Sequence, residues 1–396
     1  MTDPSTMAAT TPSNASSQQK KKGLRIVEII TTLGVGGAEM HLLALTRGLL
    51  ARGHFPEIVY LKGDGELAFD FLRSGVPVQK ISMESAKSAP HAIWKLSKFL
   101  RRAKPDLVHT HLLKADSAGA VAALLAGKRR RLLASKHNDE RALLHPVFGR
   151  VHGLLSTLDR RVIVLSNHVG RFVAEHGRVS PQKIRRVYYG LDPEKFENAK
   201  PDGIREELKI NTNEFVITCV ARFAPQKAHN ILLEALKKAL HEVPEMRLLL
   251  VGDDPFGDHR RRAERIAEEL KLGDRVRFLG IRRDVPRILA GSDCFAMSSL
   301  WEGLGLVFLE AMAARLPIVA TNVSAVPEVV PQPRCGLLVP PNDAPAMARA
   351  FVEIAKKADR GKSMGEEGRT WVREKFGMDR MIDETLAILE GVAAEA

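Results

Sequence analysis

Short apolar runs alternate with amphipathic stretches along the first half of the chain. Leu24 to Thr31 is an apolar run bounded by Lys-Lys-Gly and Gly34, which predicts a buried strand. A glycine loop follows, and Ala38 to Arg52 then carries its leucines at helical spacing. Further strands are predicted at Glu57 to Leu61, Asp106 to His109 and Arg161 to Ser166, and further helices at Ala92 to Arg102 and around Ser117 to Ala126.

The same alternation begins again near residue 215. Because strands and helices alternate in both halves, each half is expected to form a parallel sheet covered by helices on both faces. Two such α/β domains would place a ligand cleft between them, at the carboxyl ends of the strands. In this half we expect strands at 215–220, 247–251, 276–279, 293–297, 317–321 and 336–339, and helices at 230–242, 264–270, 304–314, 344–358 and after Trp371.

The domain boundaries follow from these patterns and from the chain length of 396 residues. We expect an N-terminal domain over 24–190, a C-terminal domain over 191–370 and a closing helical segment over 371–396 that packs back towards the N-terminal domain. Residues 1–23 are rich in Ser, Thr, Ala and Gln and end in a lysine triplet without a following apolar run. They are therefore expected to be a disordered tail rather than a signal peptide.

Positive charge is concentrated in the first half. Residues 24–190 contain 27 Lys and Arg against 13 Asp and Glu, whereas the whole chain has a net charge of +13. This asymmetry fits an anionic partner such as a lipid surface, and it fits an ordinary solvated basic face equally well. Aromatic residues are only 5% of the chain, which argues against nucleic acid as the partner. The most concentrated basic groups are Lys128 to Arg131, Arg160-Arg161 and Arg185-Arg186.

Cysteine content and hydropathy point to a cytoplasmic location, with membrane contact only at the surface. The three cysteines are isolated in apolar surroundings, which predicts buried thiols rather than disulfides or a zinc site. No run approaches the roughly 18 apolar residues that a membrane span requires. We therefore expect a cytoplasmic protein that can associate peripherally with the inner face of the cell membrane through its basic groups.

The most informative stretch is Ser298 to Ala320, SSLWEGLGLVFLEAMAARLPIVA. Glu302 precedes the helix expected from Leu304, and Glu310 lies inside it. If helical rise applied throughout, the two carboxylates would be about 12 Å apart along the axis, which is comparable to the span from a donor sugar to its ribose. Free backbone N–H groups at Gly303 to Leu306 would suit a phosphate between them. The alternative is an exposed amphipathic helix with two unrelated glutamates.

A second charged group follows a predicted strand in the segment VARFAPQK. Arg222 and Lys227 are expected on a loop before a helix, where two cations can neutralise a leaving diphosphate. A solvated loop would account for them equally well when they are considered alone.

Together these segments resemble retaining glycosyltransferase family 4, whose GT-B fold has two facing Rossmann-like domains. Each match is weak alone, but the matches occur in the family's order and extend over nearly the whole chain from Leu24. The matching segments are Gly34-Val-Gly-Gly-Ala-Glu39, Pro105 to His111, Val162 to Ser166, Tyr189-Gly-Leu-Asp192, Arg222 with Lys227, Val251-Gly-Asp253, Glu302 to Pro317 and Gly336 to Pro340.

The resemblance implies a role for each matched residue. Gly36 and Gly37 would allow the first loop to approach the donor diphosphate and the acceptor. His111 would line the catalytic cleft beside the transferred sugar, and Glu302 would contact sugar hydroxyls. The remaining donor contacts would be Arg222 and Lys227 on the phosphates, the loop Gly303, Leu304, Gly305 and Leu306, and Glu310 on the ribose.

Four positions depart from the family's usual pattern. Ala228, Arg315 and Ala325 stand where the family usually has glycine, and Tyr189 stands where it usually has asparagine. None of these changes removes a charged donor contact. They bear on loop geometry and substrate choice rather than on the class of reaction.

The resemblance implies a retaining, metal-independent hexosyltransferase without a cofactor. Its donor would be a nucleoside diphosphate sugar, with UDP-sugars favoured. The acceptor would be a glycan or a lipid-linked molecule, in the assembly of surface polysaccharide or lipopolysaccharide. Three alternatives remain: a non-enzymatic protein of this fold, a nucleic-acid-binding protein of this fold, and a nucleotide-sugar epimerase. A phosphorylase would need a lysine-held pyridoxal phosphate, for which the sequence offers no support.

Overall fold

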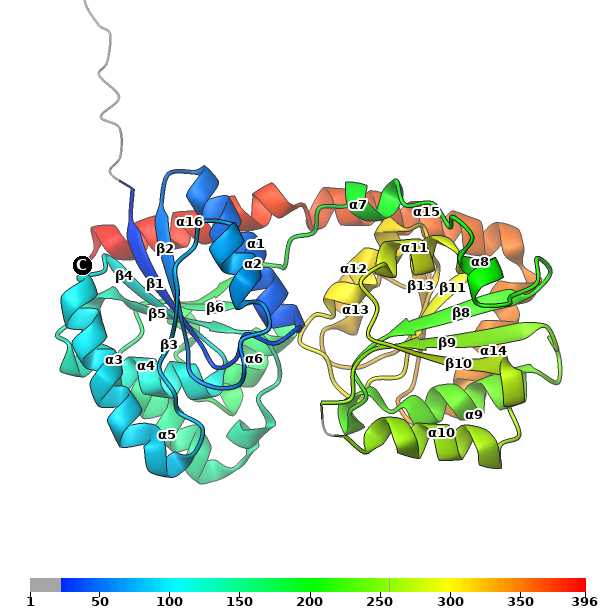
Figure 1. The fold of residues 1–396 in the computed structure, drawn as a ribbon, viewed down its shortest axis with the longest axis horizontal. Coiled ribbons are helices and arrows are strands. Elements are labelled where there is room, and N and C mark those ends of the chain that lie inside the picture. Colours follow the sequence, from blue (N-terminus) through cyan, green and yellow to red (C-terminus); the bar gives the residue numbers. More distant parts are fainter. Residues whose placement is uncertain (1–22, 256) are drawn as a thin grey trace, which may run out of the picture.

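A computed structural model describes residues 23–255 and 257–396. The tail expected at 1–23 therefore lies outside the described residues, apart from Gly23. Figure 1 shows two α/β units side by side, each built around one parallel sheet. These sheets confirm the α/β, GT-B-like architecture that the sequence predicts.

The N-terminal unit contains a sheet with strand order β3-β2-β1-β4-β5-β6-β7. The central strands are buried along almost their whole length, as expected where helices cover both faces, although they include polar residues. Its strands are β1 (Arg25–Ile30), β2 (Phe55–Tyr60), β3 (Val78–Lys80), β4 (Leu107–His111), β5 (Leu132–Lys136), β6 (Val162–Val164) and β7 (Ile184–Arg186). Its helices are α1 (Gly37–Ala51), α2 (Ala68–Arg73), α3 (Ala89–Ala103), α4 (Leu113–Leu125), α5 (Pro146–Ser156) and α6 (Asn167–Glu175).

The C-terminal unit contains a sheet with strand order β10-β9-β8-β11-β12-β13. Its strands are β8 (Phe215–Val220), β9 (Met246–Val251), β10 (Val276–Gly280), β11 (Cys294–Met297), β12 (Ile318–Thr321) and β13 (Gly336–Val339). Its helices are α7 (Glu194–Glu197), α8 (Ile204–Glu207), α9 (His229–Ala239), α10 (His259–Glu269), α11 (Val285–Ala290), α12 (Leu306–Ala313), α13 (Val326–Val329), α14 (Ala344–Lys356) and α15 (Ala358–Lys375).

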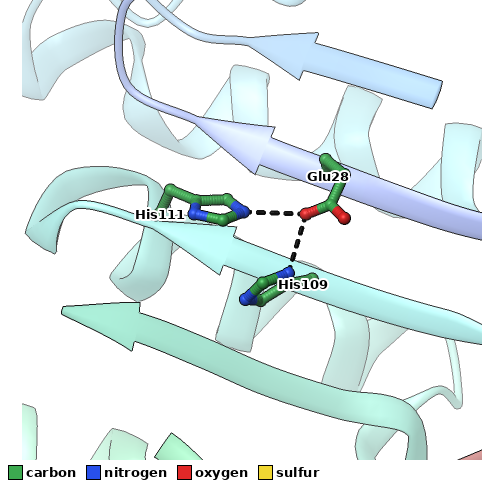
Figure 2. Close-up of side chains that lie close together, drawn as sticks. All are labelled: Glu28, His109 and His111. Atoms are coloured by element: carbon green, nitrogen blue, oxygen red, sulfur yellow. Dashed lines mark hydrogen bonds and ion pairs between the residues drawn. The ribbon is translucent and has the colours of Figure 1, made fainter. Parts of the chain in front are cut away.

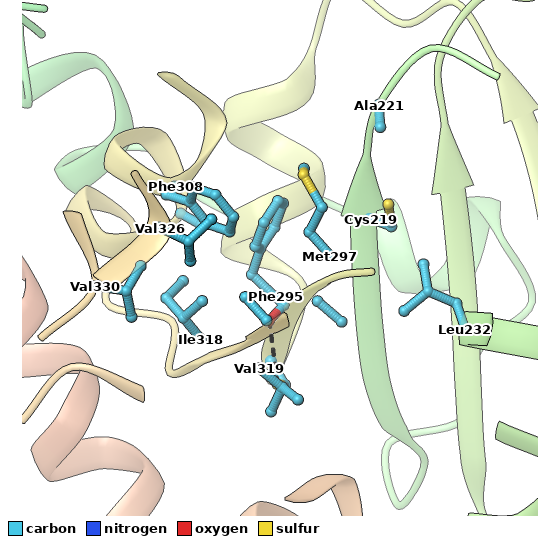
Figure 3. Close-up of a cluster of buried hydrophobic side chains, with 14 of the residues drawn as sticks. Cys219, Ala221, Leu232, Phe295, Met297, Phe308, Ile318, Val319, Val326 and Val330 are labelled. Carbon is cyan, nitrogen blue, oxygen red and sulfur yellow. Dashed lines mark hydrogen bonds between the residues drawn. The ribbon is translucent and has the colours of Figure 1, made fainter. Parts of the chain in front are cut away.

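The core of the C-terminal unit fixes the strands that carry the site loops. Phe295 and Met297 of β11 pack against Phe308 of α12 and Ile318 of β12, and all four side chains are almost completely buried (Figure 3). The cysteines Cys219, Cys294 and Cys335 are buried and unpaired, as the sequence predicts. Tight packing of this kind leaves the loops after β8 and β11 on a rigid base.

The last helix, α16 (Met378–Ala394), returns to the N-terminal unit and packs against α1. Figure 1 shows α15 and α16 running from one unit across to the other. Ile382 lies in the N-terminal core, and Arg52, directly after α1, forms ion pairs with Asp379 and Asp383. The chain thus connects its two units by a helical strap as well as by the segment after β7.

Several elements were not predicted from the sequence. They include β3, β5 and β7, which are short or carry charged residues, and the helices α2, α5, α6, α7, α8, α11 and α13. A search of the described residues for a helix long and apolar enough to cross a membrane finds none.

Candidate active site

The two units meet through contacts between loops at the carboxyl ends of their strands. The Glu328 carboxylate of α13 accepts hydrogen bonds from the backbone N–H groups of Asn167 and His168, at 2.8 and 2.7 Å. These N–H groups begin helix α6, so Glu328 caps a helix of the opposite unit. Ser324 adds a hydrogen bond of 2.9 Å to Asp139. The cap and this hydrogen bond hold the two strand edges face to face.

Gly303 lies where the two edges come close together. A Cβ atom at this position would lie 2.3 Å from the carbonyl oxygen of His137, which is too short for any side chain. Glycine is therefore required where the loop after β11 meets the loop after β5. Beside it, the Arg141 guanidinium lies over the ring of Trp301, 4.8 Å from the ring centroid.

On the C-terminal side, Lys227 and Glu302 form an ion pair. Lys227 follows β8 and Glu302 follows β11, which are neighbouring strands, so both side chains reach the same edge of the sheet. Ser299 Oγ also donates to the Glu302 carboxylate at 2.6 Å. Glu302 is buried and Lys227 is partly buried, so the pair is shielded from water. Both residues are expected at the donor site from the family resemblance, and the structure brings them into direct contact.

The helix after Glu302 is shorter than predicted. It begins at Leu306 rather than Leu304, and Gly305, with φ of 83°, forms its left-handed N-cap. Glu302 lies in the preceding loop, so the axial separation of about 12 Å estimated from helical rise does not apply. The N–H groups of Gly303, Leu304, Gly305 and Leu306 have no protein acceptor within the ranges 23–255 and 257–396. They remain available to an anion, as the sequence predicts.

Arg222 lies in the loop after β8 with an exposed side chain. Its charge lowers the pKa of Glu39 across the interface, although burial raises that pKa overall. Glu39 is in the first turn of α1 and accepts a 2.7 Å hydrogen bond from Thr32. A Cβ atom at Gly36 would lie 2.5 Å from this carboxylate, while Gly37 has open space around it. The first glycine loop therefore lies within electrostatic reach of Arg222.

Glu310 is a half-buried acid of the C-terminal unit. It sits on α12, and among the described residues its carboxylate has neither a hydrogen bond nor an ion pair. Burial raises its pKa to about 7, and the charge of Lys195 only partly opposes this effect. A carboxyl group with a raised pKa and no hydrogen-bonding protein partner is suited to a ligand that supplies hydrogen-bond donors.

On the N-terminal side, three polar side chains share one face of the buried sheet. Register pairs Glu28 of β1 with His109 of β4, and His111 lies two residues further along the same strand. Side chains two apart point to the same face, so both histidines approach the carboxylate (Figure 2). Glu28 Oε2 is 2.7 Å from His111 Nε2 and 2.8 Å from His109 Nδ1. Burial would raise the pKa of Glu28, but the two histidines outweigh it and hold the pKa at about 2.

A chain of hydrogen bonds continues from this carboxylate. His111 Nδ1 is 2.9 Å from His137 Nε2, and His137 Nδ1 is 2.7 Å from the hydroxyl of Tyr189. Burial lowers the pKa of His111 to about 4 and lowers that of His137 well below its ordinary value. Since ionised Glu28 can only accept, neutral His111 must donate through Nε2, and His137 and Tyr189 must each donate towards His111 in turn.

This chain revises the position expected for His111. Its side chain is completely buried and both ring nitrogens are bonded to protein groups, so it does not face an open cleft in this structure. His137 stands between His111 and the interface with Gly303, and sequence reasoning did not select it. The signal was present in the pattern: His109-x-His111 and Ser135-x-His137 end two neighbouring strands on one face.

Glu28, His109 and His111 are also grouped closely enough to be considered as metal ligands. Zinc bonds of about 2.0–2.1 Å in a tetrahedral site would separate the donor atoms by roughly 3.3 Å. The observed separations of 2.7 and 2.8 Å from Glu28 Oε2 are hydrogen-bond lengths instead. The geometry therefore fits a polar cluster better than a preformed metal site.

Comparison with known proteins agrees with this architecture. A family model described as Glycosyltransferase Family 4 matches residues 35–195, and one described as Glycosyl transferases group 1 matches residues 202–371. Among solved structures, a glycosyltransferase from Rickettsia africae superposes with a TM-score of 0.81 and 22% identity over 93% of this chain and 98% of that one. The Anabaena HepE complex with UDP-glucose gives 0.81 and 22% over 93% and 100%.

Curated relatives share a substantial part of the sequence. The UDP-Gal:alpha-D-GlcNAc-diphosphoundecaprenol alpha-1,3-galactosyltransferase of Escherichia coli is 31% identical over 65% of this chain and 68% of its own length. The N-acetyl-alpha-D-glucosaminyl L-malate synthase of Bacillus anthracis is 26% identical over 73% and 76%. A GDP-mannose-dependent phosphatidylinositol monomannoside mannosyltransferase of Mycobacterium tuberculosis is 29% identical over 69% and 74%. From its two matched regions and these relatives, the chain belongs to glycosyltransferase family 4.

Proposed function

We propose that this enzyme transfers a hexose-type sugar from a nucleoside diphosphate sugar, with UDP-sugars favoured, to a glycan or lipid-linked acceptor. The observation that carries the proposal is the Lys227–Glu302 pair beside the open N–H groups of Gly303 to Leu306. Lysine and backbone N–H groups suit a diphosphate, and a carboxylate suits sugar hydroxyls. The activities for which the relatives are named, which include transfer from UDP-galactose and from GDP-mannose, support a nucleotide-sugar donor.

In this proposal, donor binding exchanges one ion pair for two new contacts. The diphosphate takes Lys227 away from Glu302, and the freed carboxylate then accepts hydrogen bonds from the sugar. Exposed Arg222 adds a second cation to the leaving phosphate. Glu310 accepts hydrogen bonds from the ribose hydroxyls. Because the protein already supplies two cations, the reaction proceeds without a metal ion.

The chemical step is a transfer with retained anomeric configuration. The bond between the anomeric carbon and the phosphate oxygen breaks, and a bond from the acceptor oxygen forms on the same face of the sugar. The acceptor proton passes to the leaving phosphate oxygen. Lys227, Arg222 and the N–H groups of the Gly303 loop stabilise the charge that develops there. His137, held by His111, lies at the interface where the sugar would be bound.

The test begins with donors. The melting temperature of the purified protein is measured in the presence of UDP-glucose, UDP-galactose, UDP-N-acetylglucosamine or GDP-mannose. A donor that binds raises the melting temperature. The donor that binds is then supplied with candidate acceptors, and NMR of the product reports the anomeric configuration. If no nucleotide sugar stabilises the protein, the proposed function is wrong. Stabilisation by GDP-mannose alone would correct the nucleotide, an inverted product would correct the mechanism, and loss of activity in EDTA would correct the metal independence.

We place this activity in the cytoplasm, at the inner face of the membrane, in the assembly of surface polysaccharide or lipopolysaccharide. This proposal is supported by two relatives that are named for lipid-linked acceptors, which are a diphosphoundecaprenol and phosphatidylinositol monomannoside.

A further inference from the structure

Helix α5 has its apolar side outwards. The face of α5 that packs on the protein carries the buried Gly149, His152 and Ser156, and the half-buried Leu155 also contacts the core. The face that points to solvent carries Val147, Phe148, Val151 and Leu154, which are 55, 58, 52 and 72% exposed. At 3.6 residues per turn, these four side chains lie within about 120° of the helix circumference, opposite the buried three. An ordinary surface helix has the reverse arrangement.

The buried side of α5 cannot exchange places with the exposed side. A Cβ atom at Gly149 would lie 2.4 Å from the carbonyl oxygen of His176. His152 Nδ1 is 2.7 Å from the carbonyl oxygen of Gly177, and its Nε2 is 2.7 Å from buried Lys136. These contacts fix the rotation of the helix, so its apolar stripe stays exposed. Contiguous exposed apolar surface of this kind marks a binding surface.

The apolar stripe begins beside the candidate active site. Leu144, which is 42% exposed, extends it backwards into the short 3₁₀ helix Arg141–Leu144. Arg141, at the start of that turn, stacks on Trp301, the neighbour of Glu302. Figure 1 shows α5 on the outside of the N-terminal unit. A surface that bound the stripe would thus extend towards the interface where the sugar is transferred.

The surrounding charge is positive. Residues 141–158 contain no Asp or Glu, and the exposed side chains Arg141 and Arg150 flank the stripe. Exposed Arg178 packs beside Gly153 of the same helix, with its Cβ 2.7 Å from a Cβ built there. An apolar helix face flanked by arginines is the arrangement with which helices bind the interface of an anionic bilayer.

The basic groups selected from the sequence are less well placed for this role. Arg131 pairs with Asp106, and Arg160 and Arg161 both pair with Glu395. Lys128 to Arg131 and Arg160-Arg161 precede β5 and β6, at the amino ends of the strands. That edge is opposite the one that carries His111 and His137.

We propose that the outward face of α5, with Leu144 and its flanking arginines, docks on an anionic phospholipid bilayer and brings the membrane to the mouth of the active site. The inference deepens the proposed transfer to a lipid-linked acceptor and rests on it. It assigns membrane attachment to an apolar helix face rather than to the basic cluster at Lys128 to Arg131.

The experiment is co-sedimentation of the full chain with phosphatidylcholine vesicles, with and without phosphatidylglycerol. The test variant is Phe148→Ser with Leu154→Ser, which removes two apolar groups without changing the charge. A matched control is Phe69→Ser with Leu72→Ser on α2, whose side chains are 66 and 54% exposed. A third variant replaces Lys128 to Arg131 by glutamine. Because the serine-substituted residues are exposed, the melting temperature should change little.

We expect the α5 variant to lose at least about tenfold in binding to the anionic vesicles, while the α2 control keeps it and the glutamine variant keeps most of it. Binding retained by the α5 variant, or lost equally in the α2 control, would overturn the proposal. So would a wild-type protein that stays in the supernatant. A dimer in sedimentation velocity that the α5 substitutions abolish, without vesicle binding, would identify a second copy as the occupant. Thermal melting with UDP-sugars distinguishes failure of the membrane proposal from failure of the proposed function, because donor binding does not involve α5.

Discussion

His111 Nε2 lies 2.7 Å from Oε2 of Glu28, and both side chains are completely buried in the parallel sheet. The carboxylate anchors a hydrogen-bond chain through His111 and His137 to Tyr189. Because each neutral imidazole has one donor and one acceptor, the charge on Glu28 sets the tautomer of both histidines. Glu28 is thus a positioning residue for the histidines that stand between the sheet and the domain interface.

The first prediction concerns how much the Glu28 carboxylate contributes to the stability of the fold. Glu28→Ala leaves the Nε2–H group of His111 without an acceptor and opens a cavity, and we expect it to lower the free energy of unfolding by about 3–5 kcal/mol. Glu28→Gln fills the space and its amide oxygen still accepts from His111, so its loss should be about half as large. Urea unfolding of the two variants measures the difference. Equal losses would show that the hydrogen-bond chain does not depend on an acceptor at this position.

The second prediction concerns the stability of the fold at acidic pH. Burial lowers the pKa of His111 and His229 to about 4, and that of His137 is also well below its ordinary value. Below about pH 6.5 the unfolded chain takes up protons on these groups that the folded chain refuses, so stability falls as pH falls from 6.5 towards 4. We expect about 1–2 kcal/mol per histidine at pH 5.

Glu310 acts in the opposite direction. Its folded pKa of about 7 lies above the ordinary value, so its protonation adds stability as pH falls from 7 to 4.5. Glu310→Gln removes this compensation, and the variant should lose stability more steeply than the wild type between pH 7 and 5. Urea midpoints across this range measure both slopes, and parallel slopes would contradict the assignment for Glu310.

The third prediction concerns the Lys227–Glu302 pair. Lys227→Ala should reduce turnover by about 10²-fold, because it removes a cation from the leaving phosphate. It also leaves buried Glu302 with Ser299 as its remaining partner. Stability losses of Lys227→Ala and Glu302→Ala should therefore not add, with a coupling of about 1–3 kcal/mol in a double-mutant cycle. Lys238→Ala, an exposed lysine on α9, is the control. Additive losses would mean that the pair is not formed in solution.

The fourth prediction concerns backbone strain where the sequence departs from its family. Arg315 has a φ of 60° and Ala228 a φ of 44°, both in the left-handed region that favours glycine. Arg315→Gly and Arg315→Ala both lose the exposed ion pair with Glu366, but only glycine relieves the backbone. We expect Arg315→Gly to be more stable than Arg315→Ala by about 1 kcal/mol. Thermal unfolding of the two variants decides the sign.

The strands β1, β4, β8 and β9 were predicted from the sequence because each contains a short run of apolar residues, and all four are almost entirely buried. β3 and β7 are largely exposed three-residue strands at the sheet edges, and β5 ends in Lys136. Helix α5 was not predicted from the sequence. Most of its apolar residues face solvent, whereas prediction from amphipathic spacing assumes that the apolar face of a helix is buried.

Some features of the candidate site could be predicted from the sequence and others could not. Arg222, Lys227, Glu302 and Glu310 could be selected because they stand in segments that match the motifs of the glycosyltransferase family in order along the chain. The contact between Lys227 and Glu302 could not be foreseen, because it depends on β8 and β11 being neighbours in the sheet. Their first residues, Phe215 and Cys294, are 79 positions apart in the sequence. The role of Glu28 depends equally on the register of β1 against β4.

The fifth prediction concerns donor binding and pH. Ribose hydroxyls donate hydrogen bonds best to an ionised carboxylate, so the nucleotide favours Glu310 without its proton. With a pKa of about 7 in the unliganded enzyme, Glu310 must release that proton on binding, and affinity should rise about tenfold from pH 6 to 8. UDP-glucose is the suitable probe because its diphosphate keeps a constant charge over this range. Glu310→Gln should bind more weakly with no such dependence, while Lys195→Gln should move the midpoint upwards by removing the nearby cation. A pH profile in Glu310→Gln that matches the wild type would place the ribose elsewhere.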